Sequence, residues 1–90
     1  MEQERIDNDK PELNVKEFLA VLVKAIVDKP EEVTVNEISS ERTVIYELKV
    51  NKSDMGMVIG RRGHHAQALR TLLAATSSKR RKRAVLEIIE

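Results

Sequence analysis

The sequence predicts an α+β domain in which a mixed three-stranded sheet carries its helices on one face. Near residue 33 the spacing at which apolar residues recur changes from 3.6 residues, typical of a helix, to 2 residues, typical of a strand. A second helical pattern covers residues 64–77, and a β-rich segment spans residues 84–89. The predicted order is therefore αββααβ. Ninety residues leave room for one modest core. We expect residues 1–12 to be a flexible leader and residues 13–90 to form the domain.

The first helix is predicted to begin at Val15. Asn14 is a suitable N-cap, and Glu17 follows it at the capping-box position. Leu13 and Phe18 occupy the two positions of a hydrophobic staple. Apolar residues at helical spacing define the face expected to pack on the core: Phe18, Leu19, Leu22, Ala25 and Ile26.

Two strands are predicted after this helix, which Pro30 should end near Asp28. Residues 33–36 alternate between valine and polar side chains, and residues 39–41 form a short polar turn. Residues 43–50 show the clearest alternation of the chain. The two strands should form a hairpin.

The second half of the chain is predicted to contain two helices and a parallel strand. Residues 54–59 suit about one helical turn, with Ser53 as a cap, and residues 64–77 form an amphipathic helix. Its expected core-facing residues are Ala66, Leu69, Leu72, Leu73 and Thr76. The crossover is long enough to place strand 84–89 parallel to the second strand.

Charge is distributed unevenly along the chain. Residues 1–54 carry 8 Lys/Arg against 13 Asp/Glu, whereas residues 55–90 carry 8 against 2. The basic half suits a polyanionic partner. We expect the basic run Lys79–Arg83 to extend a phosphate-binding surface, with a solvated loop as the alternative. On either interpretation, replacing Arg80 and Arg81 with Ala should change stability little.

One short motif carries the functional prediction: Val58-Ile59-Gly60-Arg61-Arg62-Gly63, at the junction of the two later helices. Glycines there tolerate unusual backbone angles, and the N–H groups that begin a helix attract phosphate. Two arginines beside them add positive charge. A tight helix–helix turn is the structural alternative.

With its αββααβ order, this motif and the following helix resemble a type II KH domain, which binds single-stranded RNA. The chain is most similar to the small bacterial single-KH proteins of the KhpA (YlqC) group, over about residues 13–90. The resemblance implies a nucleic-acid-binding groove clamped at the GRRG loop. The implied contact residues are Val58, Ile59, Gly60, Arg61, Arg62, Gly63, His64, Leu69 and Arg70.

The resemblance also implies an apolar groove floor of Val58, Ile59 and Leu69, completed by Ile45 or Tyr46. Base selectivity should be weak, because Phe18 and Tyr46 are the only aromatic residues. The implied role is that of an RNA chaperone or post-transcriptional regulator. Its implied partners are single-stranded RNA and either a second copy of the chain or a larger multidomain KH protein. A protein-interaction domain that keeps the KH shape without binding RNA is the alternative.

Other classes of function find no support in the sequence. The chain lacks cysteine, a P-loop pattern and a Rossmann pattern, and the adjacent His64 and His65 do not form a metal site. We therefore expect no enzymatic activity, no cofactor and no metal. No signal peptide or membrane span is visible, and the composition suits a reducing cytoplasm.

Overall fold

The computed structural model describes residues 14–90, apart from the side chain of Ser78. Single-turn 3₁₀ helices precede β1, α2 and α3, namely η2 (Pro30–Glu32), η3 (Lys52–Asp54) and η4 (Arg61–Gly63). The longer elements are, in order, α1 (Val15–Lys24), β1 (Thr34–Ser39), β2 (Thr43–Lys49), α2 (Met55–Ile59), α3 (His64–Arg80) and β3 (Arg83–Ile89). The predicted αββααβ order is confirmed. The predicted leader, residues 1–12, and the proposed staple residue Leu13 lie outside the described residues.

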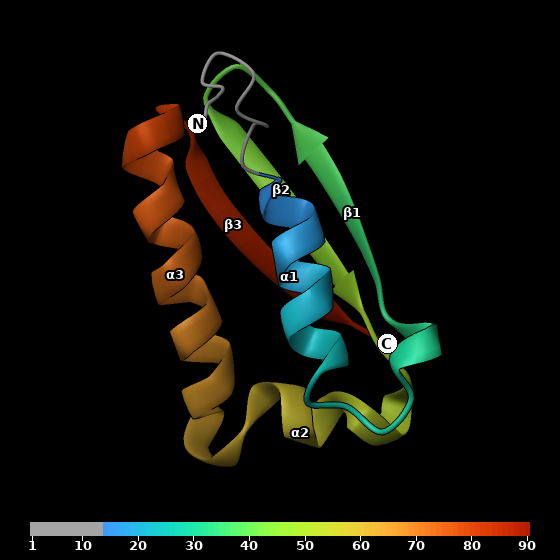
Figure 1. Cartoon of the computed structure of the whole chain (residues 1–90). Helices are drawn as coiled ribbons and strands as arrows, with labels where there is room; N and C mark the ends of the chain where they lie inside the picture. Colours follow the sequence, from blue (N-terminus) through green and yellow to red (C-terminus); the bar gives the residue numbers. More distant parts are fainter. Residues whose placement is uncertain (1–13) are drawn as a thin grey trace, which may run out of the picture.

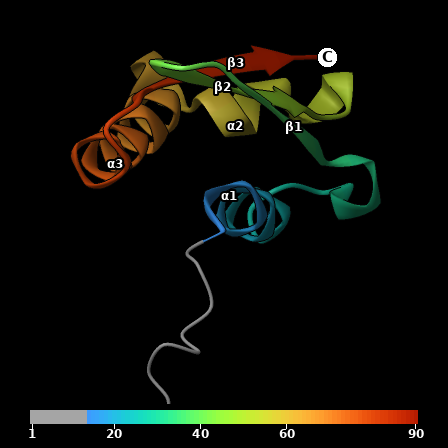
Figure 2. The same ribbon diagram turned by 90° about the horizontal axis from the view of Figure 1, so that it is seen from above.

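The sheet has the order β1-β2-β3 (Figure 1). β1 and β2 pair antiparallel as a hairpin, and β2 and β3 pair parallel, with Tyr46 opposite Leu86. Figure 2 shows α1, α2 and α3 on the same side of the sheet. The predicted mixed sheet with its helices on one face is therefore confirmed.

The core lies between this sheet and the helices. Alternate residues of β2 face the helices, and burying one such large apolar side chain contributes about 1.5–3 kcal/mol. The residues at the centre of the core are Leu19, Val23, Val44, Tyr46, Leu48, Val58, Leu69, Leu73 and Leu86.

α1 begins as predicted but packs on a different face. The side chain of Asn14 accepts a hydrogen bond from the Glu17 N–H (3.0 Å), which confirms the cap. The buried residues are Val15, Leu19 and Val23, whereas Phe18 is 59% exposed and Ala25 and Ile26 are exposed too. The predicted face was wrong except at Leu19 and the partly buried Leu22. Because α1 is apolar on several sides, its periodicity did not select one.

Asp54 explains why the chain leaves α1 at Lys24 rather than near Asp28. This carboxylate is only 1% exposed and accepts hydrogen bonds from the N–H groups of Asp28 (3.2 Å) and Lys29 (3.1 Å). Both N–H groups must turn away from a helical ladder to reach it. Asp54 thereby joins the end of the first helical segment to the start of α2.

The cap before α2 also differs from the prediction. The side chain of Asn51, not that of Ser53, accepts the hydrogen bond from the Ser53 N–H (2.8 Å). The Ser53 hydroxyl donates to the same Asn51 oxygen (2.7 Å). Asn51 therefore shapes the turn that leads from β2 into α2.

α3 is three residues longer than predicted. It runs to Arg80, so the basic run is shared between the helix end, the turn and the first residue of β3. Ala66, Leu69 and Leu73 are buried as expected, but Leu72 is exposed. The face of α3 that packs against β3 is therefore narrower than the predicted apolar face.

Arg80 has a structural role that contradicts the expectation for the basic run. Its guanidinium donates a hydrogen bond to the hydroxyl of the buried Tyr46 (2.9 Å) and lies 3.6 Å from the Glu37 carboxylate. Burial raises the pKa of the Tyr46 phenol, Glu37 raises it further, and Arg80 acts in the opposite direction. Replacing Arg80 should therefore affect stability, because a buried hydroxyl would lose its partner.

Candidate nucleic-acid interface

The loop between α2 and α3 turns through three residues with positive φ. Gly60 has φ 79°, Arg62 has φ 59° and Gly63 has φ 74°. Glycine reaches such angles without a steric penalty, whereas a residue with a Cβ pays about 1–2 kcal/mol. Arg62 is thus held in a conformation that its own side chain disfavours.

Gly60 is required for close packing as well as for its backbone angle. A Cβ at this position would lie 2.6 Å from Cγ of His65, too close for any side chain. The His65 ring is fixed there by a hydrogen bond between its Nδ1 and the Met57 carbonyl oxygen (2.7 Å). By contrast, a Cβ on Gly63 would meet open space, so only its φ favours glycine there.

His65, the second residue of α3, supports the loop and was missed by the sequence analysis. We expected His64 beside the phosphate, and His64 is exposed at the first position of α3. The contact of His65 with Gly60 and Met57 depends on how α2 and α3 meet. No spacing rule would have found it.

The positive side chains carry most of the phosphate attraction that this loop can offer. The Gly63 N–H donates to the Gly60 carbonyl (3.0 Å), and the His64 N–H donates to the Arg61 carbonyl. Both N–H groups are therefore used within the loop. Arg61 and Arg62 are exposed. They can form charge-assisted hydrogen bonds with phosphate oxygens.

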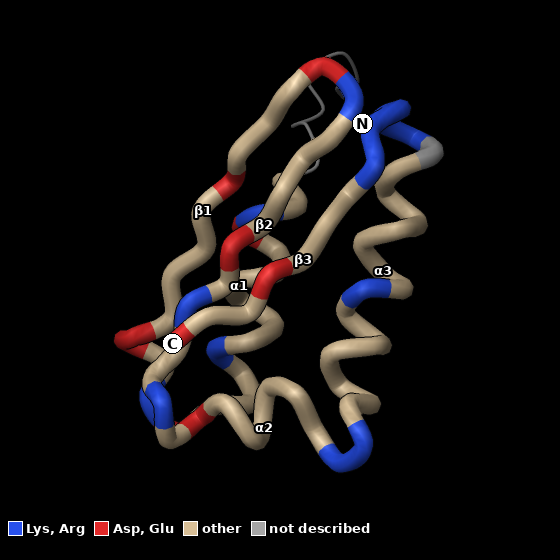
Figure 3. The backbone as a smooth tube through the Cα atoms, turned by 180° about the vertical axis from the view of Figure 1, so that it is seen from behind, with Lys and Arg blue, Asp and Glu red and all other residues tan. Residues whose placement is uncertain are grey.

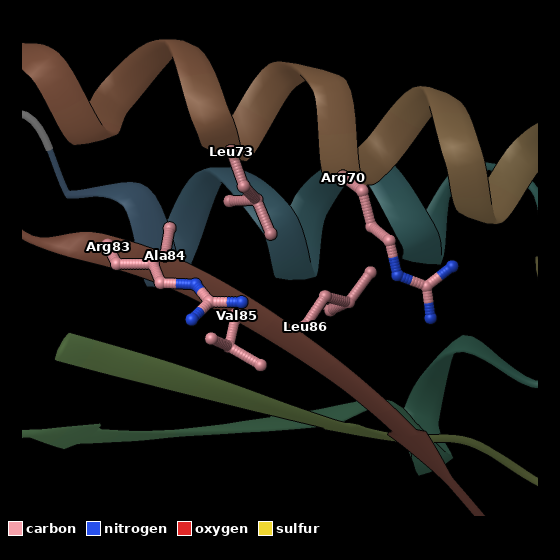
Figure 4. A pocket seen from close by; sticks show the side chains of 6 residues that line it. All are labelled: Arg70, Leu73, Arg83, Ala84, Val85 and Leu86. Atoms are coloured by element: carbon pink, nitrogen blue, oxygen red, sulfur yellow. The ribbon is translucent and has the colours of Figure 1, made fainter.

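A pocket of about 200 Å³ lies between α3 and β3. Figure 4 shows Leu73 and Leu86 in the space between helix and strand, with Arg70 on one side and Arg83 on the other. The lining residues are Arg70, Leu73, Arg83, Ala84, Val85 and Leu86. An apolar centre flanked by two guanidinium groups suits a flat base attached to an anionic backbone.

The groove floor differs from the expected one. Tyr46 is completely buried, and Ile45 alternates with it and so points to the sheet face without helices. As the central strand, β2 has its helix-facing side covered, so β3 supplies the groove wall instead. Val58 is also fully buried and Leu69 nearly so, beneath the loop rather than in open contact with solvent. Ile59, which is 37% exposed, remains accessible.

Lys and Arg residues gather at both ends of α3 (Figure 3). The segment from Met55 to Leu86 contains no acidic residue. Arg70 lies on α3 between the two ends and lines the pocket. The structure thus brings the GRRG loop, Arg70 and the α3–β3 pocket to one side of the domain.

Residues 14–90 contain no group of three or more His, Cys, Asp or Glu residues arranged to hold a metal. No helix within this range combines the length and the apolar character needed to cross a membrane.

The chain is similar to known proteins over most of its length. A family model described as "KhpA/KhpB, KH domain" matches residues 16–88. The RNA-binding protein KhpA of Clostridium perfringens is 48% identical over 75 residues, covering 83% of this chain and 100% of that protein. The proteins of the same name from Chlamydia trachomatis and Borreliella burgdorferi are 49% and 47% identical, covering 84% and 86% of this chain and 97% and 94% of theirs. No solved structure gives a significant match.

Proposed function

The chain belongs to the KhpA/KhpB family of KH domains, and from this premise we propose that it binds single-stranded RNA through the GRRG loop and the α3–β3 pocket. The observation that carries the proposal is that the exposed Arg61 and Arg62 and all the residues that line the α3–β3 pocket belong to one segment of 32 residues, 55–86, that contains no acidic residue. Its relatives are named RNA-binding proteins. Residues 13–90 form the binding domain, and catalysis plays no part in this role.

The loop holds the sugar-phosphate backbone. Gly60 and Gly63 permit the turn, and Arg61 and Arg62 contact phosphate oxygens. His64 lies at the start of α3 beside them. Val58 and Leu69 support the loop from the core, and the accessible Ile59 adds apolar contact.

The pocket receives bases against the outer edge of β3, with which no strand of residues 14–90 pairs. The Arg83 N–H donates to the Arg42 carbonyl, and the Ile89 carbonyl accepts from the Val50 N–H. The backbone N–H and carbonyl groups of the odd-numbered residues of β3 therefore point toward β2. Leu86 therefore turns its N–H and carbonyl toward the open edge. A base can pair with these groups while packing against the partly buried Ala84 and the exposed Arg70, which line the pocket together with the buried Leu73 and Leu86. Arg70 and Arg83 neutralise the adjoining phosphates.

Base selectivity is weak in this arrangement. Tyr46 is buried and Phe18 lies on α1, so neither aromatic ring belongs to the pocket. Recognition by stacked bases on aromatic platforms therefore has no residues to carry it. The protein prefers single-stranded RNA to duplex, because its pocket takes unpaired bases.

Replacing Arg61 and Arg62 together by Asp tests the proposal. Asp tolerates the left-handed backbone of Arg62 better than most residues, so the turn survives. Each substitution reverses a phosphate contact of about 1 kcal/mol at 4 Å in water. Two reversals lower RNA affinity at least tenfold, even after screening by salt.

The measurement is fluorescence anisotropy with a labelled ten-nucleotide single strand at fixed salt, together with a melting curve for each protein. Lys16→Glu with Lys49→Glu is the matched control, because it makes the same charge change at exposed sites on α1 and β2. The control keeps most of its affinity. A charge-reversed loop that melts normally and still binds RNA like the parent would favour the protein-interaction alternative.

Salt and strand type give a second test of the same site. With about three or four phosphates neutralised, the logarithm of the affinity falls against the logarithm of salt with a slope of roughly −2 to −3. Affinity for a duplex is lower than for its separated strands. Equal affinities would contradict a pocket for unpaired bases.

A single KH domain covers few nucleotides, so we propose that this chain binds RNA together with a partner protein. A second copy or a larger multidomain KH protein would raise the effective concentration on one RNA. Such an assembly acts in the cytoplasm, as an RNA chaperone or a post-transcriptional regulator. Light scattering at high protein concentration tests the homodimer, and a strictly monomeric mass would leave only the larger partner.

A further inference from the structure

The imidazole ring of His65 is held against the GRRG loop by one of its two nitrogens. The last carbonyls of a helix lack a partner within that helix, and the Met57 carbonyl is one of these because α2 ends at Ile59. The ring supplies the missing partner, with Nδ1 2.7 Å from the Met57 oxygen. Gly60 packs on the same side of the ring, where an added Cβ would lie 2.6 Å from Cγ and 2.8 Å from Nδ1.

The Met57 carbonyl decides which nitrogen of this ring carries the proton. A carbonyl oxygen only accepts hydrogen bonds, so Nδ1 is the donor in this contact. A neutral imidazole has a single N–H, and the bond made by one nitrogen therefore sets the state of the other. Nε2 of His65 is then a hydrogen-bond acceptor.

This acceptor lies in a part of the surface that is otherwise suited to phosphate. His65 is exposed, and within residues 14–90 no hydrogen bond engages its Nε2. The neighbouring Arg61 and Arg62 side chains only donate hydrogen bonds, as phosphate requires. Phosphate oxygens accept hydrogen bonds, so they pair with the arginines and not with Nε2. The ligand group that meets Nε2 must instead be a donor.

We propose that Nε2 of His65 accepts a hydrogen bond from a ribose 2′-hydroxyl, so that this residue lets the protein distinguish RNA from DNA. This role rests on the proposed function, in which the GRRG loop holds the sugar-phosphate chain. Arg61 and Arg62 cannot make the distinction, because RNA and DNA carry the same phosphates. The 2′-hydroxyl is the donor that RNA has and DNA lacks, and it lies one sugar away from each phosphate that the loop contacts.

Three ten-nucleotide strands of one sequence test this role, with ribose, 2′-fluororibose or deoxyribose as the sugar. Fluorine cannot donate a hydrogen bond, but it keeps the sugar close to its shape in RNA. Fluorescence anisotropy is measured at pH 8, where an imidazole is ordinarily neutral. The parent binds the RNA strand roughly fivefold more tightly than either other strand, the effect of one hydrogen bond. A 2′-fluoro strand that binds as tightly as RNA would overturn the proposal.

His65→Asn separates the roles of the two nitrogens. The amide N–H of Asn can take the place of Nδ1 and donate to the Met57 carbonyl, so the melting temperature stays within a few degrees of the parent's. No atom of Asn reaches the position of Nε2. This variant therefore binds RNA roughly fivefold less tightly than the parent and binds DNA equally well. His64→Asn is the matched control one residue earlier, and it changes the affinities for RNA and DNA by the same factor.

His65→Gln makes the opposite change and covers the case in which Asn does not hold the loop. Its amide reaches the position of Nε2 but not that of Nδ1, so this variant melts lower than the parent and keeps a preference for RNA. If His65→Asn folds and prefers RNA as strongly as the parent does, or if His65→Gln loses the preference, the proposal is overturned while the proposed function stands. A parent that binds none of the three strands would overturn both.

Discussion

Replacing Arg80 with Ala should destabilise the domain, although Arg80 belongs to a basic run at the surface. Its guanidinium bonds the hydroxyl of Tyr46 at 2.9 Å and approaches the Glu37 carboxylate to 3.6 Å. Tyr46 is completely buried in the centre of the sheet. Without Arg80, the Tyr46 hydroxyl loses the charged donor that it bonds in the folded protein.

The size of the effect follows from these two contacts. A hydrogen bond from a charged donor contributes about 1.5–3 kcal/mol, and an ion pair whose arginine is 36% exposed adds less than about 1 kcal/mol. We expect Arg80→Ala to lower the free energy of unfolding by about 2 kcal/mol. Tyr46→Phe should cost about 1 kcal/mol, since Arg80 can then turn to Glu37 and water. The double variant should cost about 2 kcal/mol, because no buried hydroxyl remains unpaired.

Urea denaturation of the parent, both single variants and the double variant measures this cycle. The expected coupling between Arg80 and Tyr46 is about 1 kcal/mol. Lys79→Ala is the control from the same helical turn, and it should stay within about 0.5 kcal/mol of the parent. If Arg80→Ala were as stable as this control, the hydrogen bond to Tyr46 would not support the core, and the original expectation that this replacement changes stability little would be restored.

Three further changes test other parts of the structure. Asp54→Ala should lower the free energy of unfolding by roughly 2–3 kcal/mol in urea titrations, because two part-buried backbone N–H groups lose the charged acceptor that the buried Asp54 provides; a loss below about 0.5 kcal/mol would contradict this. Gly60→Ala should destabilise more than Gly63→Ala by thermal melting, since only the former also drives a Cβ against His65; equal losses would show that backbone angle alone matters. Because burial raises the pKa of Tyr46, the unfolded chain loses that proton first. The free energy of unfolding should therefore be constant with respect to this group below about pH 10 and fall above it, by at most about 1.4 kcal/mol per pH unit. In Tyr46→Phe, the free energy of unfolding should lack this contribution to its decrease above about pH 10. If the parent and the variant lost stability identically at alkaline pH, the raised pKa of Tyr46 would be refuted.

The element order was predictable because the apolar period changes clearly along the chain. The alternation of residues 43–50 placed the central strand, and Asn14 marked the first helix start. The buried face of α1 was not predictable in the same way. Residues 15–27 carry two competing apolar stripes. One consists of Val15, Leu19, Val23 and Val27, the other runs through Phe18, and only contact with the sheet selects the first for burial.

The candidate site was predictable where it is local in sequence. The GRRG loop is contiguous, so its glycines and arginines could be found by motif. The pocket wall from β3 could not, because it depends on which strand lies at the sheet edge beside α3. The contact of His65 with Gly60 and the bond of Arg80 to Tyr46 likewise join residues whose distance is fixed by packing.

The five-residue helix α2 is held at both ends, and this bears on the speed of RNA binding. Asp54 fixes its start to the segment after α1, and the bond between His65 and the Met57 carbonyl fixes its end to α3. A loop suspended between two such anchors has its binding shape before any RNA arrives. Association should then be a fast, salt-dependent encounter without a slow ordering step, and strands that differ in affinity should differ mainly in how long they stay bound.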